Sequence, residues 1–289
     1  MGETHSKVGI PLLLASSLRW LVPRNACLAN QMISSTMASP SKRGTVEKAA
    51  LLLTSLTLAG VLLEAVAFWR GVGRARRYAA AGRRFERRLS ARYATVLILG
   101  DSTGVGVGAT LPEESIAGLL AADYPDAHIV NVAVSGTCVA GAVEQVRRCL
   151  EAGLHFDLAL LHVGGNDVVA DTPLHRLAGD CDTLLQELGR LAARTVWLGP
   201  PDLGLAPLFP RLYAWVVASR SRVASQVFSA AAARHDVVFV DFSAPAHVAH
   251  FRERRHKHFA IDGFHPNSAS YKYGYLTARQ MLGLQTRPR

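Results

Sequence analysis

A serine, an asparagine, an aspartate and a histidine stand in short glycine-containing blocks of the 289-residue sequence. The first block, Gly100-Asp101-Ser102-Thr103-Gly104, directly follows an apolar run of strand length. A serine at a strand-to-helix turn exposes its hydroxyl and has its own N–H near a helix N-terminus, so Ser102 is a candidate nucleophile. The alternatives are a helix N-cap or a phosphate loop. The GxGxG spacing of Gly104, Gly106 and Gly108 departs from the GxGxxG of dinucleotide loops, and the GKS/T of a P-loop is missing.

Three further blocks could supply the rest of a hydrolytic site: Ser135-Gly136, Gly164-Gly165-Asn166-Asp167 and Asp262-Gly263-Phe264-His265-Pro266. A serine hydroxyl is a poor nucleophile at neutral pH and needs a base such as His265. Asp262, three residues earlier, could reach the far ring nitrogen and fix the tautomer. An oxyanion could bind the side-chain amide of Asn166 and the backbone N–H of Gly136. Each residue also has an ordinary alternative role, in a turn, a helix start or an Asx-turn, but their joint occurrence favours catalysis.

The elements that must position these blocks alternate between strands and helices. Runs apolar on both faces, typical of parallel strands covered on both sides, lie at Thr95–Leu99, His128–Val132, Leu158–Val163, Thr195–Leu198 and Val237–Val240. Apolar residues at helical spacing occupy Leu111–Asp123, Thr137–Gly153, Pro173–Ala193, Tyr213–His235 and Ser268–Leu284. We expect Pro112 in the first turn of its helix. The order predicts a doubly wound α/β fold with a mainly five-stranded parallel sheet, whose ligands bind at the C-terminal strand ends.

With all four blocks in order, residues 94–284 resemble the SGNH hydrolases, also called GDSL esterases or lipases. The resemblance implies a flavodoxin-like fold and a triad of Ser102, Asp262 and His265. It also implies an oxyanion hole made by the backbone N–H of Ser102 together with Gly136 and Asn166.

The reaction implied by the resemblance is hydrolysis of a carboxylic ester through an acyl-enzyme, with no metal and no organic cofactor. Thr103 stands where the GDSL motif has leucine, which puts substrate preference in doubt rather than activity. Two alternatives remain open. One is an acyltransferase that uses the same triad on a sugar or lipid hydroxyl, and the other is a non-catalytic membrane-associated binding module.

Other polar residues are expected to have lesser roles. We interpret Asp101 and Asp167 as hydrogen-bonding supports of the catalytic loops, and His162 as a packed core residue. The segment Pro200–Pro210 is either a rigid connector or one wall of an apolar substrate pocket. Four histidines near several arginines and a lysine are expected on a solvated loop rather than in a metal site: His247, His250, His256 and His258.

The net charge of +10 lies almost entirely before the catalytic blocks. Residues 1–93 hold 15 Lys/Arg and 4 Asp/Glu, whereas residues 94–289 hold 17 and 18. The basic balance therefore does not point to a nucleic-acid ligand of the globular part. Residues 70–93 form an arginine-rich segment directly after an apolar stretch, an arrangement suited to anionic headgroups.

Ala49–Trp69 is an apolar run of 21 residues with one ionisable group, Glu64, and is expected to span a membrane. A buried or surface helix is the alternative. The following arginines favour a cytoplasmic catalytic domain, and the free cysteines fit a reducing compartment. A signal anchor that places the domain in the periplasm or outside the cell remains possible. Residues 1–48 are expected to be disordered, and Met37 is an alternative start. The sequence does not predict the oligomeric state.

Overall fold

The computed structural model describes residues 40–90 and 94–282. The chain divides into two units, Met1–Val66 and Ala67–Arg289. The expectations for residues 1–39 lie outside the described residues, whereas residues 40–48, also expected to be disordered, belong to a helix. The second unit includes residues 67–90 as well as the part that carries the four blocks.

Helix α2 (Pro40–Ala80) begins in the first unit and contains the predicted span Ala49–Trp69. Among the described helices it alone is long and apolar enough to cross a membrane, over Glu47–Ala80 with a mean hydropathy of 2.1 in its most apolar window. Hydroxyls within it donate to carbonyls one turn earlier: Thr54 to Ala50, Ser55 to Leu51 and Thr57 to Leu53, at 2.7–2.8 Å. These polar groups are therefore satisfied inside the helix.

The second unit is built on a five-stranded sheet in the order β2-β1-β3-β4-β5, with every pair parallel. The strands are β1 (Ala94–Gly100), β2 (Ala127–Asn131), β3 (Leu158–His162), β4 (Thr195–Leu198) and β5 (Val238–Val240). This is the flavodoxin-like order, and each strand overlaps a predicted run. The predicted fold class is confirmed.

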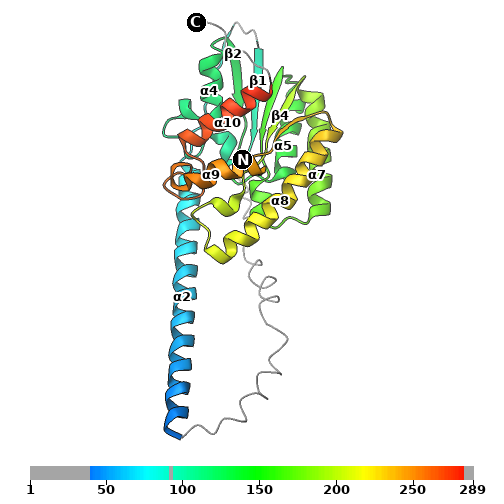
Figure 1. Ribbon diagram of the computed structural model, residues 1–289. Coiled ribbons are helices and arrows are strands. Elements are labelled where there is room, and N and C mark those ends of the chain that lie inside the picture. Colours follow the sequence, from blue (N-terminus) through cyan, green and yellow to red (C-terminus); the bar gives the residue numbers. More distant parts are fainter. Residues whose placement is uncertain (1–39, 91–93, 283–289) are drawn as a thin grey trace, which may run out of the picture. The chain divides into compact units, whose positions relative to one another are not determined.

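Helices cover both faces of the sheet (Figure 1). On one face lie α5 (Val139–Glu151), α7 (Leu174–Leu191) and α8 (Arg211–Arg234), packed over a core that includes the fully buried Trp197 and Phe228. On the other face lie α4 (Ile116–Asp123), α9 (Pro245–Glu253) and α10 (Ser268–Met281). The short helices α3 (Ser102–Val105) and α6 (Gly165–Val169) follow β1 and β3.

Two predicted elements differ from the structure. The helix expected over Leu111–Asp123 is divided into a 3₁₀ turn, η2 (Pro112–Glu114), and α4, so Pro112 begins the turn and not the α-helix. The division falls at Ser115, whose hydroxyl accepts the Gly118 N–H and donates to the Pro112 carbonyl. The expected solvated loop before the last block is instead α9 followed by the turn η4 (Arg255–Lys257).

The part of α2 that belongs to the second unit packs against the catalytic end of that unit. Phe68 contacts the rings of Phe209 and Tyr213, with centroids 6.1 and 5.8 Å away. A side chain at Gly71 would collide with Leu208, so this glycine permits the close approach of the helix. The Leu208 N–H in turn donates to the Gly263 carbonyl at 3.0 Å.

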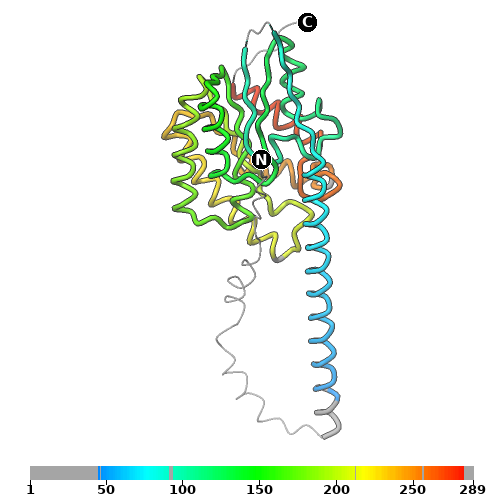
Figure 2. Tube along the Cα trace, turned by 180° about the vertical axis from the view of Figure 1, so that it is seen from behind, coloured from blue at the N-terminus to red at the C-terminus, as the bar shows by residue number. Residues whose placement is uncertain are grey.

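The following stretch continues along the sheet edge beside β2, as the cyan tube in Figure 2 shows. Arg87 exchanges both backbone hydrogen bonds with Ile129 of β2, at 3.0 and 2.8 Å. Its guanidinium donates to the carbonyls of Ala121, Tyr124 and Pro125, around the end of α4. At least one residue of the arginine-rich segment is therefore part of the architecture of the second unit.

Candidate active site

Ser102 is the first residue of α3, at the C-terminal end of β1. Gly100 has φ 118°, and a side chain there would collide with the backbone of His162. Asp101 donates its N–H to the His162 carbonyl at 2.7 Å, and its Oδ1 accepts the Thr103 N–H at 2.8 Å. This cap starts the helix at Ser102 and holds the serine at the open end of the sheet.

Ser102, His265 and Asp262 form a chain of hydrogen bonds. The His265 Nε2 lies 3.1 Å from the Ser102 Oγ, and the His265 Nδ1 lies 2.5 Å from the Asp262 Oδ2. The other oxygen of Asp262 accepts the N–H groups of Phe264 and His265, so the aspartate also shapes the turn that carries the histidine. Burial raises the pKa of Asp262, but hydrogen bonds from His265 and the Phe264 N–H outweigh it and hold the pKa below its ordinary value.

Gly136 lies in the loop that follows β2, and Asn166 is the second residue of α6, which follows β3. Gly136 has φ 87°, and no described atom would lie within 4 Å of a side chain placed there, so the loop leaves open space beside it. The Asn166 Nδ2 donates one hydrogen bond to the Thr137 carbonyl at 2.8 Å, which ties the two loops together. Its second amide hydrogen remains available, because an amide nitrogen carries two donors.

Asp101 and Asp167 are both buried at this end of the sheet. The Asp167 Oδ2 accepts the Val139 N–H at the start of α5 (2.9 Å), and its Oδ1 accepts the hydroxyl of Thr172 (3.2 Å). Burial raises the pKa of Asp167 above its ordinary value and raises the pKa of Asp101 to about 6. Each carboxyl group binds a backbone N–H of a loop that carries a candidate residue.

Gln145 on α5 connects two of these loops and was not predicted from the sequence. Its Oε1 accepts the Gly100 N–H at 2.8 Å, and its Nε2 donates to the Gly100 carbonyl at 2.9 Å and to the Thr137 hydroxyl at 3.2 Å. The sequence offered one indication of this role. Gln145 is a polar residue three positions after the buried Ala142 and four before the buried Cys149, so it lies on the inward side of the helix.

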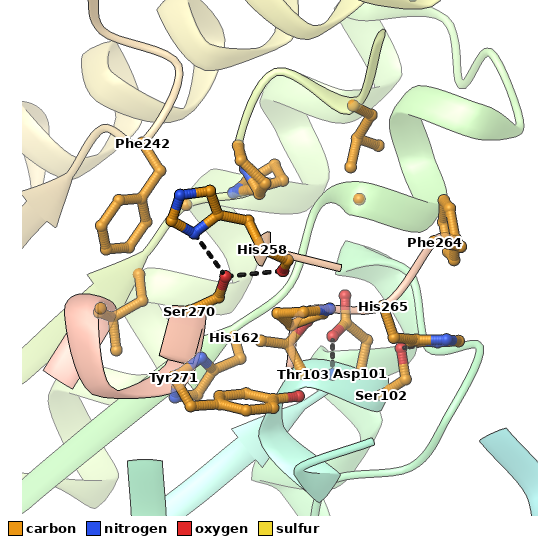
Figure 3. A pocket seen from close by; sticks show the side chains of 18 of the residues that line it. Asp101, Ser102, Thr103, His162, Phe242, His258, Phe264, His265, Ser270 and Tyr271 are labelled. Carbon is orange, nitrogen blue, oxygen red and sulfur yellow. Dashed lines mark hydrogen bonds between the residues drawn. The ribbon is translucent and has the colours of Figure 1, made fainter. Parts of the chain in front are cut away.

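A cavity of about 110 Å³ opens at Ser102 and His265 and extends beneath α10. Figure 3 shows Ser102, His265 and Phe264 on one side of it and Phe242 on the other. The segment Pro200–Pro210 contributes five of the lining residues, so the loop forms a wall of the cavity: Pro200, Pro201, Asp202, Leu203 and Leu205. From η4, Arg255 donates to the carbonyls of Leu205 and Ala206 and holds this wall in place.

Three of the four histidines before the last block contact neighbouring aromatic or polar side chains. His250 stacks on Tyr273 with ring centroids 4.0 Å apart, and the His247 Nδ1 lies 2.6 Å from the Tyr273 hydroxyl. His258 is buried and lines the cavity. The expectation of solvated histidines is therefore wrong for His258, which is buried, and His247 is half-buried, whereas His250 is exposed although it stacks on Tyr273. Within residues 40–90 and 94–282, no cluster of three or more His, Cys, Asp or Glu side chains could hold a metal ion.

The fold and the grouping of Ser102, His265 and Asp262 are typical of serine hydrolases built on a parallel α/β sheet. Residues 98–273 match the model of the GDSL-like lipase/acylhydrolase family, and the chain belongs to that family. This membership confirms the SGNH family and the enzyme class expected from the sequence, an ester hydrolase of the esterase or lipase type.

Solved structures with the same fold are only distantly similar in sequence. TesA is 22% identical, with a TM-score of 0.50 over 65% of this chain and 97% of its own. LAE5, an alpha/beta hydrolase from the metagenome of Lake Arreo in Spain, is 21% identical, with a TM-score of 0.52 over 66% and 97%. A catalytic mutant of the acetylxylan esterase Axe2 from Geobacillus stearothermophilus is 18% identical, with a TM-score of 0.51 over 70% and 100%. No curated protein matches the sequence.

Proposed function

We propose that the protein hydrolyses carboxylic esters with Ser102 as the nucleophile, through an acyl-enzyme. The observation that carries the proposal is the hydrogen-bond chain from the Ser102 Oγ through His265 to Asp262. His265 takes the serine proton as the Oγ attacks the ester carbonyl, and then gives it to the departing alcohol. Asp262 holds the Nδ1–H tautomer and stabilises the imidazolium. A water molecule, activated in the same way by His265, releases the acid.

The oxyanion of each tetrahedral intermediate binds three donors in this proposal: the backbone N–H groups of Ser102 and Gly136 and the side-chain amide of Asn166. Ser102 is the first residue of α3, so its N–H is one of the donors that a helix leaves unpaired. The Asn166–Thr137 hydrogen bond fixes the amide beside the Gly136 loop. Asp101 and Asp167 support these loops through their bonds to Thr103 and Val139.

The test is turnover of p-nitrophenyl butanoate and labelling by a fluorophosphonate, with the full chain in detergent. Ser102→Ala is expected to abolish labelling and to reduce kcat by at least about a thousandfold. Ser229→Ala, on the exposed side of α8, is the matched control and is expected to retain both signals. Labelling or parental turnover in the Ser102→Ala protein would show that this serine is not the nucleophile.

Product analysis distinguishes hydrolysis from acyl transfer by the same residues. With a competing alcohol present, a hydrolase releases mainly the free acid, whereas an acyltransferase forms the new ester. A protein that takes up the fluorophosphonate at Ser102 but forms only the transferred ester would be the acyltransferase. A folded protein without labelling would be the binding module.

We also propose that α2 anchors the protein in a membrane and that the arginines after Trp69 keep the catalytic unit in the cytoplasm. The length and hydropathy of Glu47–Ala80 and the exposed arginines that follow support this topology. A reporter enzyme fused to the C-terminus, active only in the cytoplasm, is expected to be active. Activity of a reporter that requires export would instead place the unit in the periplasm or outside the cell.

A further inference from the structure

The cavity beside Ser102 extends from Ser102 and His265 to Phe242 and Gly274, and Gly136 is not among its lining residues. Its far walls come from the face of the sheet under α4 and α10, where Ile116, Leu198, Phe242 and Gly274 line it. These residues belong to or pack against the apolar core of that face. An apolar space that reaches Ser102 fits the part of an ester that stays bonded to this serine after the alcohol has left.

One polar atom in the wall of this cavity has no partner. The Nε2 of His162 is buried and makes no hydrogen bond to any described residue. His162 is only 2% exposed and lines the cavity from the end of β3. An unpaired buried polar atom is unfavourable, so a ligand group that forms a hydrogen bond with it is bound more tightly.

Two small side chains leave room in the cavity. Thr103 lines it at the position where the GDSL motif has leucine, and a leucine would extend further into the space. Gly274 of α10 lines the far end, where an added methyl group would lie 3.5 Å from both Ile116 and Phe242. That distance is ordinary van der Waals contact, so the methyl group fits but occupies part of the cavity.

The size of the cavity limits the chain it can hold. An apolar protein cavity of about 150 Å³ binds one benzene molecule. The present cavity, at about 110 Å³, is smaller and suits an acyl chain on the order of four carbons. A longer straight chain would meet the walls formed by Phe242 and α10.

We propose that this cavity is the acyl pocket of the enzyme, that it selects short acyl chains, and that His162 favours a chain bearing a hydroxyl group. The inference rests on the proposed ester hydrolysis at Ser102 and names the class of substrate for it. A hydroxyl both donates and accepts, so it pairs with the His162 Nε2 in either tautomer.

The first test measures kcat/KM for p-nitrophenyl acetate, butanoate, hexanoate and octanoate with the full chain in detergent. We expect the parent to prefer butanoate over octanoate at least tenfold. Gly274→Ala is expected to lower the butanoate-to-acetate ratio about tenfold, because one methylene in an apolar pocket changes specificity by roughly this factor. Octanoate turnover equal to butanoate turnover would overturn the size limit.

Gly179→Ala provides the matched control. Gly179 lies within α7, and a methyl group added there meets no described atom within 4 Å. Both substitutions replace a helical glycine by alanine and raise helix propensity alike. The Gly179→Ala protein is therefore expected to keep the parental chain-length ratio. An unchanged ratio in Gly274→Ala would show that the cavity does not hold the acyl chain.

The second test compares ethyl 3-hydroxybutanoate with ethyl butanoate by titration of the acid released. The parent is expected to prefer the hydroxy ester about tenfold, and His162→Phe to lose this preference. His162→Gln keeps a hydrogen-bonding group and is expected to retain part of it. His175→Phe, at an exposed position of α7, is the control for a surface histidine. Equal kcat/KM for the two esters in the parent would overturn the role of His162.

These outcomes are separable from failure of the proposed function. If no ester is hydrolysed in a manner that depends on Ser102, the proposed hydrolysis itself is wrong. If Ser102-dependent hydrolysis occurs but neither Gly274→Ala nor His162→Phe alters selectivity, only the acyl pocket is wrong.

Discussion

The side-chain amide of Gln145 pairs with both backbone polar groups of Gly100, accepting its N–H at 2.8 Å and donating to its carbonyl at 2.9 Å. A third bond, 3.2 Å long, joins the same amide to the Thr137 hydroxyl. Gly100 precedes Asp101, the residue that caps α3 before Ser102, and Thr137 follows Gly136. One side chain therefore joins the turn before Ser102 to the loop that carries Gly136. Gln145 is thus a positioning residue for the proposed oxyanion hole.

Gln145→Met is expected to lower kcat by about 10- to 100-fold while KM changes little. The substitution removes the partner of the Gly100 N–H and leaves the Gly100 carbonyl with the Val134 N–H alone, at a cost of about 1–3 kcal/mol. It also loosens the geometry needed in the transition state. Steady-state kinetics on p-nitrophenyl butanoate would measure this. Gln226→Met, at an exposed position of α8, is the control. An equal loss of thermal stability in the two variants with kcat retained would contradict the positioning role.

Asn166→Ala is expected to lower kcat by about 10²- to 10³-fold, the usual effect of removing one oxyanion donor. The alanine also loses the bond to the Thr137 carbonyl, so the structure of the loop must be monitored. A fluorophosphonate labelling rate and a near-UV circular dichroism spectrum would separate the two effects. A kcat within threefold of the parent would exclude Asn166 from the oxyanion hole.

Asp101 should make the free energy of unfolding depend on pH in an unusual direction. Its pKa is raised to about 6 by burial, so it contributes stability that is fully present below about pH 4 and is lost as the pH rises through 6. Relative to Asp101→Asn, the parent is expected to lose about 2 kcal/mol between pH 4.5 and 7.5. Urea unfolding followed by the fluorescence of the tryptophans, among them the buried Trp197, would measure it.

Asp262→Asn provides a contrast of opposite sign. The hydrogen bonds from His265 and Phe264 hold the pKa of Asp262 below its ordinary value. The ionised carboxylate therefore contributes to the free energy of unfolding at pH above the ordinary pKa, and this contribution is lost as the pH falls. The parent is therefore expected to lose stability relative to Asp262→Asn on acidification. The same pH dependence in both comparisons would mean that the two carboxyl groups do not differ as the structure indicates.

Arg87→Met is expected to reduce the free energy of unfolding by about 2 kcal/mol, because hydrogen bonds to charged groups contribute about 1.5–3 kcal/mol. The guanidinium binds the carbonyls of Ala121, Tyr124 and Pro125, around the end of α4. Arg83→Met, at an exposed position of the same segment, is expected to change stability by less than about 0.5 kcal/mol. Equal effects in the two variants would mean that Arg87 acts only through its charge.

The sheet and the four chemical blocks were predictable because their signals are local. Each strand is a short apolar run, and each block stands directly after a strand or in a glycine-containing turn. The parallel strand order brings Ser102 and the residues after β2 and β3 to one edge of the sheet. Asp262 and His265 are joined to that edge by the loop between η4 and α10. The departure at Thr103 was visible in the sequence, but not that its side chain lines a cavity.

The remaining features depend on partners distant in the chain. Gln145 lies on a helix 45 positions from Gly100, and no local pattern marks such a pair. Helix α9 is rich in histidine and charge and shows no clear apolar stripe, so its order depends on Tyr273 of α10. The arginine-rich segment was interpreted by charge alone, whereas Arg87 is held by backbone carbonyls that the sequence does not place.

The close approach of Gly71 to Leu208 bears on where the catalytic unit can be cut. Leu208 also bonds to Gly263, next to Asp262, so a fragment starting at Thr95 would expose one side of the triad loop to solvent. It would also uncover Val105 and Val107, on which Tyr78 and Ala79 pack. A secreted or recombinant form that keeps these surfaces covered must begin near Ala67. Proteolytic release of an active enzyme would therefore leave Phe68 and Trp69 on the soluble fragment, as an aromatic N-terminus with Phe68 packed on Phe209 and Tyr213.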